Sequence, residues 1–192
     1  MKLFIITGPQ AVGKMAVGME LAEKLGIRLF HNHMTIELVK DIYGEINNKS
    51  WALVDKLRED IFDSVSESDI KGFIFTYVCA FNIKQDHDYM ESILDKFIKQ
   101  NWGTYIVELE ADIEVRKERN KTELRLKHKP TKRDIAWSHN ELVTSMDKYR
   151  MNSNPGEITH ENYIKINNSD LSVGDVVDVV INRFNLESMN IN

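Results

Sequence analysis

Apolar residues along this chain follow two alternating patterns, which are short unbroken runs and longer stretches with an apolar residue every three or four positions. Unbroken runs are typical of strands buried on both faces of a sheet, and the spaced stretches are typical of amphipathic helices. The runs predict five strands, at Lys2–Thr7, Ile27–Phe30, Gly72–Val78, Thr104–Leu109 and Tyr163–Ile166.

The spaced stretches predict helices between these strands. The first helix begins after residue 13, places Val17, Leu21 and Leu25 on one face, and ends at Gly26, in the position that glycine favours. Strands separated by helices imply an α/β protein with a parallel sheet covered on both faces, which is a three-layer α/β/α arrangement. Further helices are expected over residues 35–42, 51–65, 90–98 and 173–184.

The region after the fourth strand is rich in cations and is expected to be helical, with an interruption near Pro130. Thr131 is expected to cap the helix that follows, and Asp134 suits the first turn of that helix. A Pro-Gly pair within residues 152–161 predicts a loop before the last strand.

The segment between the first strand and the first helix reads Gly8-Pro9-Gln10-Ala11-Val12-Gly13-Lys14, the pattern G-x-x-x-x-G-K of a phosphate-binding loop. Its two glycines allow backbone angles and close approaches that a Cβ would forbid, so backbone N–H groups can converge on an anion at the helix N-terminus. Lys14 can reach the outer phosphates as a point charge. The expected nucleotide-binding residues are Gly8, Pro9, Gln10, Ala11, Val12, Gly13, Lys14 and Met15.

Met15 occupies the position at which this pattern usually continues with Ser or Thr. The hydroxyl of that Ser or Thr normally holds a magnesium ion. The sequence therefore keeps the parts that cradle phosphate and lacks one part that places the metal, and the metal-ligating residues stay unassigned.

The chain has 192 residues, of which 42% are hydrophobic and 29% are charged, as in ordinary globular proteins. One domain is expected over residues 1–184, followed by a frayed tail at 185–192. No apolar run is long enough to span a membrane, and a cytoplasmic location is expected. The single cysteine, Cys79, closes an apolar run and is expected in the core.

Charge is distributed unevenly along the chain. Residues 114–133 hold nine Lys or Arg against three acidic residues, a local charge of +6, although the whole chain carries −5 and the rest is therefore at −11. A local basic patch on an acidic protein suits a focused anionic ligand better than a long polyanion, so nucleic acid is not an expected partner.

With these features the chain resembles the small P-loop kinases, which include nucleoside-monophosphate kinases, shikimate and gluconate kinases, and zeta-toxin-like enzymes. The resemblance rests on the loop up to Lys14, a helical segment after the second strand, an arginine-bearing lid at about residues 114–133, and a short last strand and helix. It implies a P-loop NTPase fold with five parallel strands in the order 2-3-1-4-5. It also implies ATP and Mg²⁺ as cofactors and a small-molecule acceptor as the second substrate.

The stretch after the second strand departs from the shikimate-kinase pattern. Shikimate-kinase-like members have an acidic D-x-D followed shortly by I-E, whereas this chain has His31-Asn32-His33 followed by Ile36-Glu37. An acceptor other than shikimate is therefore expected. His31 and His33 are expected to alternate on the strand, to border the acceptor pocket, and to orient or deprotonate an acceptor hydroxyl. Structural histidines or a zinc-binding pair are the alternatives.

Cations supply the other candidates. Arg58 lies inside an apolar helical stripe, where a charge is rarely left unpaired, and the resemblance implies that it binds an acidic group of the acceptor. Arg119 and Arg125 are the lid residues expected to clamp the transferring phosphate, since cationic groups stabilise the charge that develops there. A solvated basic helix is the alternative. The lid candidates are Arg116, Arg119, Arg125, Lys129 and Arg133, and the expected catalytic set is Lys14, His31, His33, Arg119 and Arg125.

Two classes of function remain open. The first is an ATP-dependent small-molecule kinase, which the retention of Lys14 and of several lid arginines favours. The second is a nucleotide-binding sensor or degenerate kinase without useful catalysis, which Met15 favours because loss of the metal-holding hydroxyl weakens transition-state placement most. End-phosphorylation of a nucleic acid is a third option, but the sequence shows no surface of interleaved aromatic and basic residues.

Overall fold

The computed structural model of the protein describes residues 1–186. Its five strands form one parallel sheet in the order β2-β3-β1-β4-β5, which confirms the fold class that the resemblance implies. The strands are β1 (Lys2–Thr7), β2 (Arg28–His31), β3 (Gly72–Thr76), β4 (Gly103–Glu110) and β5 (Tyr163–Asn167).

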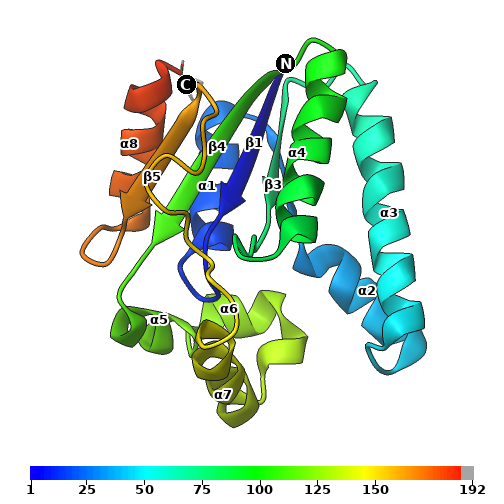
Figure 1. Ribbon diagram of the computed structural model, residues 1–192, viewed down its shortest axis with the longest axis vertical. Coiled ribbons are helices and arrows are strands. Elements are labelled where there is room, and N and C mark those ends of the chain that lie inside the picture. The colour runs from blue at the N-terminus through cyan, green and yellow to red at the C-terminus, as the bar shows by residue number, and fades with distance from the viewer. Residues whose placement is uncertain (187–192) are drawn as a thin grey trace.

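Helices connect successive strands and cover both faces of the sheet. Figure 1 shows α3 and α4 on one side of the sheet and α1 with α8 on the other, while α2, α5, α6 and α7 lie beyond the carboxyl ends of the strands. The helices are α1 (Lys14–Leu25), α2 (His33–Tyr43), α3 (Asn48–Ser66), α4 (Lys84–Lys99), α5 (Ile113–Arg119), α6 (Glu123–His128), α7 (Ile135–Met146) and α8 (Val173–Phe184), with a 3₁₀ turn, η1 (Pro130–Lys132), before α7.

Side chains alternate between the two faces of β1, as the period of a strand requires. Leu3 and Ile5 pack in a core with Phe62 of α3 and residues of α4, whereas Phe4 and Ile6 pack in a second core with residues of α1 and α8. Each strand of the sheet centre is therefore apolar on both faces, which explains the unbroken apolar runs in the sequence. Cys79 is fully buried in the first core, as expected.

The ends of two elements differ from the sequence prediction. β3 ends at Thr76, two residues before the predicted Val78. The helix after Pro130 is capped by Asp134, whose carboxylate accepts a hydrogen bond from the Trp137 N–H, so the prediction that Thr131 caps it is wrong. Thr131 instead lies in the turn η1, because Pro130 starts a separate 3₁₀ turn there.

The helices α5, α6 and α7 and the turn η1 form one unit over residues 113–146, which we call the lid. The lid is longer than the expected segment 114–133, because Ser138 of α7 donates a hydrogen bond to Asn120 at the end of α5. It meets the sheet where the strands end, the edge at which ligands of parallel α/β sheets bind. No helix within residues 1–186 is both long and apolar enough to cross a membrane.

Candidate functional site

The loop between β1 and α1, residues 8–14, is held in a conformation that depends on glycine. Gly8 has a φ of +128°, and a Cβ at that position would lie 2.2 Å from the Leu109 carbonyl oxygen of β4. Gly13, at the start of α1, has a φ of +112°. Ala11 also adopts a left-handed φ, of +59°. These backbone angles bring the loop to the N-terminus of α1, a place where backbone N–H groups favour an anion.

Lys14 is buried against this loop. Its ammonium group donates hydrogen bonds to the Gly8 carbonyl and, at 2.7 Å, to the Pro9 carbonyl. Burial, together with the nearby charges of Lys129, Arg125 and Arg116, lowers the pKa of Lys14 well below its usual value. An anion bound at this point would oppose both effects, because it would neutralise the mutual repulsion of these cations.

A first cavity, with a volume of about 290 Å³, opens between the loop, the lid and the start of α8. Met15 lies in its wall with only 6% of its surface exposed. The thioether of Met15 is apolar and offers no hard oxygen ligand, so this wall can pack against a nucleotide but cannot hold Mg²⁺. The loop therefore fits a phosphate chain, and the position after Lys14 does not fit the metal.

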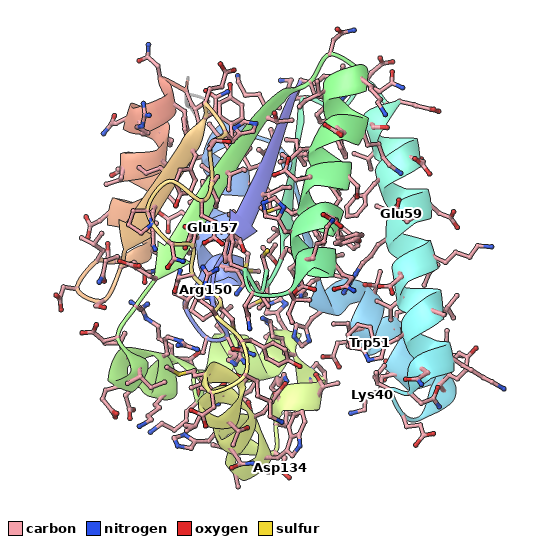
Figure 2. All side chains as sticks on the ribbon, viewed as in Figure 1. Lys40, Trp51, Glu59, Asp134, Arg150 and Glu157 are labelled. Carbon is pink, nitrogen blue, oxygen red and sulfur yellow. The ribbon has the colours of Figure 1, made fainter. Side chains whose placement is uncertain are left out.

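A second cavity, of about 680 Å³, lies between the loop, α2, the start of α3 and the lid. Figure 2 labels Lys40 of α2 and Trp51 of α3 on one side of this region and Asp134 of the lid on another. Trp51 and Trp137 both line it and are 41% and 50% exposed. The cavity thus combines two indole surfaces with charged groups of both signs, a lining suited to a small molecule that is partly apolar and partly polar.

Four residues line both cavities, and three of them are cations. They are Ala11, Lys14, Arg125 and Lys129. Arg125 is buried, its Nε has no hydrogen-bond partner, and burial lowers its pKa to about 10. Burial, followed by the charges of Arg125 and Lys132, lowers the pKa of Lys129 to about 7. The junction of the two cavities therefore gathers three basic side chains whose mutual repulsion and burial a bound anion would offset.

The other predicted lid cations hold the loop or lie outside the cavities. Arg119 lines the first cavity, donates to the Val12 carbonyl at 3.1 Å, and contacts both oxygens of Asn168 beyond β5. Arg116 donates to the Gln10 carbonyl at 2.9 Å. Arg133 is exposed and bonds a lid carbonyl. Arg116 and Arg119 thus attach the lid directly to the glycine loop.

The expectation that His31 and His33 alternate on one strand is wrong. His31 is the last residue of β2, whereas His33 begins α2, because the chain turns into the helix at Asn32. His31 is buried, its Nδ1 has no hydrogen-bond partner, and its ring centroid lies 6.2 Å from that of His128 in the lid. His33 lines the second cavity and pairs with Glu37. The two rings therefore have different surroundings.

Burial is the main cause of the low basicity of both rings. The pKa of His31 is lowered to about 4 by burial and by the charges of Lys129 and His128. Burial likewise lowers the pKa of His33 below its usual value, despite the hydrogen bond with Glu37. Both imidazoles are therefore neutral at pH 7. Within residues 1–186 no group of three or more His, Cys, Asp or Glu side chains is arranged to hold a metal ion, so a zinc pair gains no third ligand.

Arg58 is buried in α3, as its position in the apolar stripe predicts. Its guanidinium donates to the Thr35 hydroxyl and to the Asn32 carbonyl, each at 3.1 Å. Arg58 is not among the residues that line the second cavity. In this structure it fixes the turn from β2 into α2, which positions His33.

Several residues of the site carry no motif that sequence reasoning could use. The sequence places Glu37 only in the stretch after the second strand and Trp51 only at the start of a helix, and it gives Trp137 no distinguishing pattern. They come from different helices, and nothing in their spacing shows that α2, α3 and α7 meet.

Comparison with known proteins rests on structure alone, because no protein-family model and no curated protein matches the chain. A provisionally assigned kinase from Chloroflexus aurantiacus shares 16% identity, covers 96% of each chain and has a TM-score of 0.66. A gluconokinase from Sinorhizobium meliloti shares 14% identity over 96% of this chain and 91% of its own, with a TM-score of 0.58. Shikimate kinase from Acinetobacter baumannii, in complex with shikimate, shares 14% identity over 95% of this chain and 92% of its own, with a TM-score of 0.55.

This chain has the P-loop kinase fold. The identities are low enough that the likeness shows the fold and does not identify a substrate. The match covers nearly the whole length of both chains in each case, so the sheet, the helices and the lid are all included.

Proposed function

We propose that this protein is an ATP-dependent kinase that transfers the γ-phosphoryl group of ATP to a hydroxyl of a small-molecule acceptor. The observation that carries the proposal is the position of Lys14, Arg125 and Lys129, which line both cavities at their junction. A nucleotide in the first cavity and an acceptor in the second would meet at these cations. Phosphoryl transfer needs such positive charge at the transferring oxygens, because little covalent chemistry is left for the protein to perform.

The roles of individual residues follow from their places. The loop from Gly8 to Met15 would receive the phosphate chain through its backbone N–H groups and Lys14. Arg125 has a buried, unpartnered Nε and would donate a hydrogen bond to the transferring group. Arg119 would hold the glycine loop in place at the wall of the first cavity. Lys129, which lines both cavities, would act beside Lys14 and Arg125 on the transferring group. His33 would contact the acceptor, and His31 and Arg58 would support the turn that carries it.

The chemical step exchanges one P–O bond for another. The acceptor oxygen forms a bond to the γ-phosphorus, the bond from that phosphorus to the β-phosphate oxygen breaks, and the hydroxyl proton passes to a base before release to water. Mg²⁺ accompanying ATP would supply further charge neutralisation, carried mainly by phosphate oxygens and water, because Met15 provides no ligand.

The experiment is an ADP-release assay with ATP, MgCl₂ and a panel of nucleosides, sugars, polyol acids and aromatic alcohols. Acceptor-stimulated turnover should occur in the parent and fall by more than 100-fold in Lys14→Ala, since removal of one such charge costs about 10²–10³ in rate. Lys84→Ala, which removes an exposed lysine from α4, is the matched control and should keep parental turnover. A Lys14→Ala protein that binds ATP as tightly as the parent would overturn the assignment of the loop.

A sensor or degenerate kinase is the second candidate, and Met15 is the observation that favours it. Loss of the metal-holding group should weaken the transition state more than the ground state, so such a protein would bind nucleotide and release no ADP. Tight ATP binding, dependent on Lys14, with no turnover across the panel would establish this alternative and refute the kinase.

A further inference from the structure

Glu37 of α2 contacts both the second cavity's histidine and the lid. His33 Nδ1 lies 3.0 Å from Glu37 Oε1. From the lid, Thr131 donates its hydroxyl to the same oxygen at 2.5 Å and its backbone N–H to Oε2 at 3.2 Å. The side chains of His33 and Glu37 are only 12% and 15% exposed. One carboxylate therefore joins a ring that lines the cavity to a turn of the lid.

The donors around Glu37 define the state of His33. Burial raises the pKa of Glu37, but the hydrogen bonds from His33 and Thr131 outweigh burial and lower it, so the carboxylate is ionised at neutral pH. An ionised carboxylate only accepts hydrogen bonds, so the neutral imidazole carries its proton on Nδ1. Nε2 makes no hydrogen bond within residues 1–186 and keeps its lone pair. The other charges that act on the ring are those of Lys129 and Lys132.

We propose that Glu37 is a positioning residue that makes the proton-accepting form of His33 depend on the seated lid. This inference rests on the proposed function. With Thr131 bonded to Glu37, the imidazole at the wall of the second cavity is held with its proton on Nδ1 and its lone pair on Nε2. The acceptor's hydroxyl proton moves to Nε2 as its oxygen bonds to the γ-phosphorus and ADP leaves, and the proton then passes to water.

The link from Thr131 through Glu37 to His33 would restrict proton transfer to the state in which the lid is seated. A base that is aligned only when the lid is seated acts when water is excluded, which limits wasteful transfer of the phosphoryl group to water.

The test reads the histidine directly and needs no acceptor. Protein labelled with ¹⁵N-histidine is examined by NMR with the magnesium complex of AMP-PNP, and the His33 signals are assigned by their loss in His33→Gln. The parent should show the Nδ1–H tautomer. Glu37→Ala should lose it, because the acceptor of the Nδ1 proton is gone, and Thr131→Val should exchange that proton about tenfold faster.

Thr144→Val is the matched control, since Thr144 is an exposed lid residue whose hydroxyl donates to the Asn140 carbonyl of its own helix. An Nε2–H tautomer in the parent, or a Thr131→Val spectrum that matches Thr144→Val, would overturn the proposal. With an acceptor from the panel, Glu37→Gln should lower kcat by about 10²-fold and change KM by less than about twofold. Equal losses in kcat and in folded protein would indicate a merely structural role and also overturn it.

The two proposals fail separately. Absence of ADP release across the panel removes the kinase, while the tautomer and its dependence on Thr131 are measured in the same protein with a non-hydrolysable nucleotide. A confirmed kinase whose His33 is unaffected by Glu37 would leave the function standing and refute the lid-coupled base.

Discussion

Single residues in the glycine loop determine what the site can bind. Gly8 and Gly13 supply backbone conformations that other residues adopt only with strain, and Met15 replaces an oxygen ligand with an apolar thioether. The sequence predicted both features, because glycine positions and the identity of residue 15 are read directly. It predicted Lys129 only as one of five lid candidates, because which of them lies beside Lys14 depends on how the lid folds back over the loop.

Met15→Ser is expected to increase Mg²⁺-dependent turnover by roughly tenfold or more, because a hydroxyl next to Lys14 adds a ligand that acts mainly in the transition state. The measurement is ADP release against MgCl₂ concentration with the best acceptor of the panel. Met19→Ser, a change of the same type further along α1, serves as the control. Unchanged Mg²⁺ dependence in Met15→Ser would show that the missing hydroxyl does not limit the reaction.

Gly8→Ala is expected to lower the free energy of unfolding by more than about 2 kcal/mol, since a positive φ and a contact at 2.2 Å with the Leu109 carbonyl must both be relieved. Gly156→Ala provides the comparison, because Gly156 has a φ of +78° with nothing within 4 Å of an added Cβ. That variant should show the cost of the backbone angle alone, about 1 kcal/mol. Urea denaturation measures both, and equal losses would contradict the role given to the close approach.

At the scale of elements, periodicity predicted the strands and the larger helices, and it failed where polar side chains decide a boundary. The sequence pattern predicts His33 on a strand, but the turn from β2 into α2 is fixed by Arg58, a distant residue that donates to Asn32 and Thr35. Thr131 and Asp134 are both suitable capping residues by type, and the sequence predicts Thr131 as the cap of α7. The hydrogen bond from Thr131 to Glu37 of α2 instead leaves Asp134 as the cap, and sequence spacing does not show that tertiary contact.

The corrected cap gives a local prediction. Asp134→Ala should speed hydrogen exchange of the Trp137 amide by about fivefold, because loss of a cap costs about 1 kcal/mol at the first turn. Thr131→Val should leave that amide unchanged, although it weakens the link to Glu37. Exchange measured by two-dimensional NMR distinguishes the two. Faster exchange in Thr131→Val would restore Thr131 as the capping residue.

At the scale of the whole molecule, the loop between α7 and β5 is tied to the sheet by buried charge. Glu108 of β4 is fully buried and accepts hydrogen bonds from Asn152, Ser153 and Tyr163. Arg150 forms a bidentate ion pair with Glu157 in the same loop. Figure 2 labels both residues beside the sheet. The sequence predicted the loop from its Pro-Gly pair, but residues 45 positions apart meet here, and no local pattern shows it.

These carboxylates make stability depend on pH in a defined direction. Burial raises the pKa of Glu108, but the hydrogen bonds from Ser153 and Asn152 outweigh it and lower the pKa overall. The hydrogen bonds from Arg150 lower the pKa of Glu157 to about 2. A glutamate in an unfolded chain has a pKa of about 4.3, so below that pH the unfolded state binds more protons than the folded state. The free energy of unfolding that Glu108 and Glu157 contribute is therefore fully present above about pH 5 and is lost as pH falls toward 2.

Glu108→Gln is expected to lower the free energy of unfolding at pH 7 by about 2 kcal/mol, the usual cost of weakening hydrogen bonds to a buried charged group. The same variant should also lose stability less steeply between pH 5 and pH 3, since a glutamine has no proton to bind. Glu118 is an exposed lid glutamate that pairs with Lys121, and Glu118→Gln should follow the parental curve. Urea unfolding at several pH values measures all three proteins. A Glu108→Gln curve parallel to that of the parent would mean that the pKa of Glu108 is the same in the folded and unfolded states, which would contradict the donors that surround it.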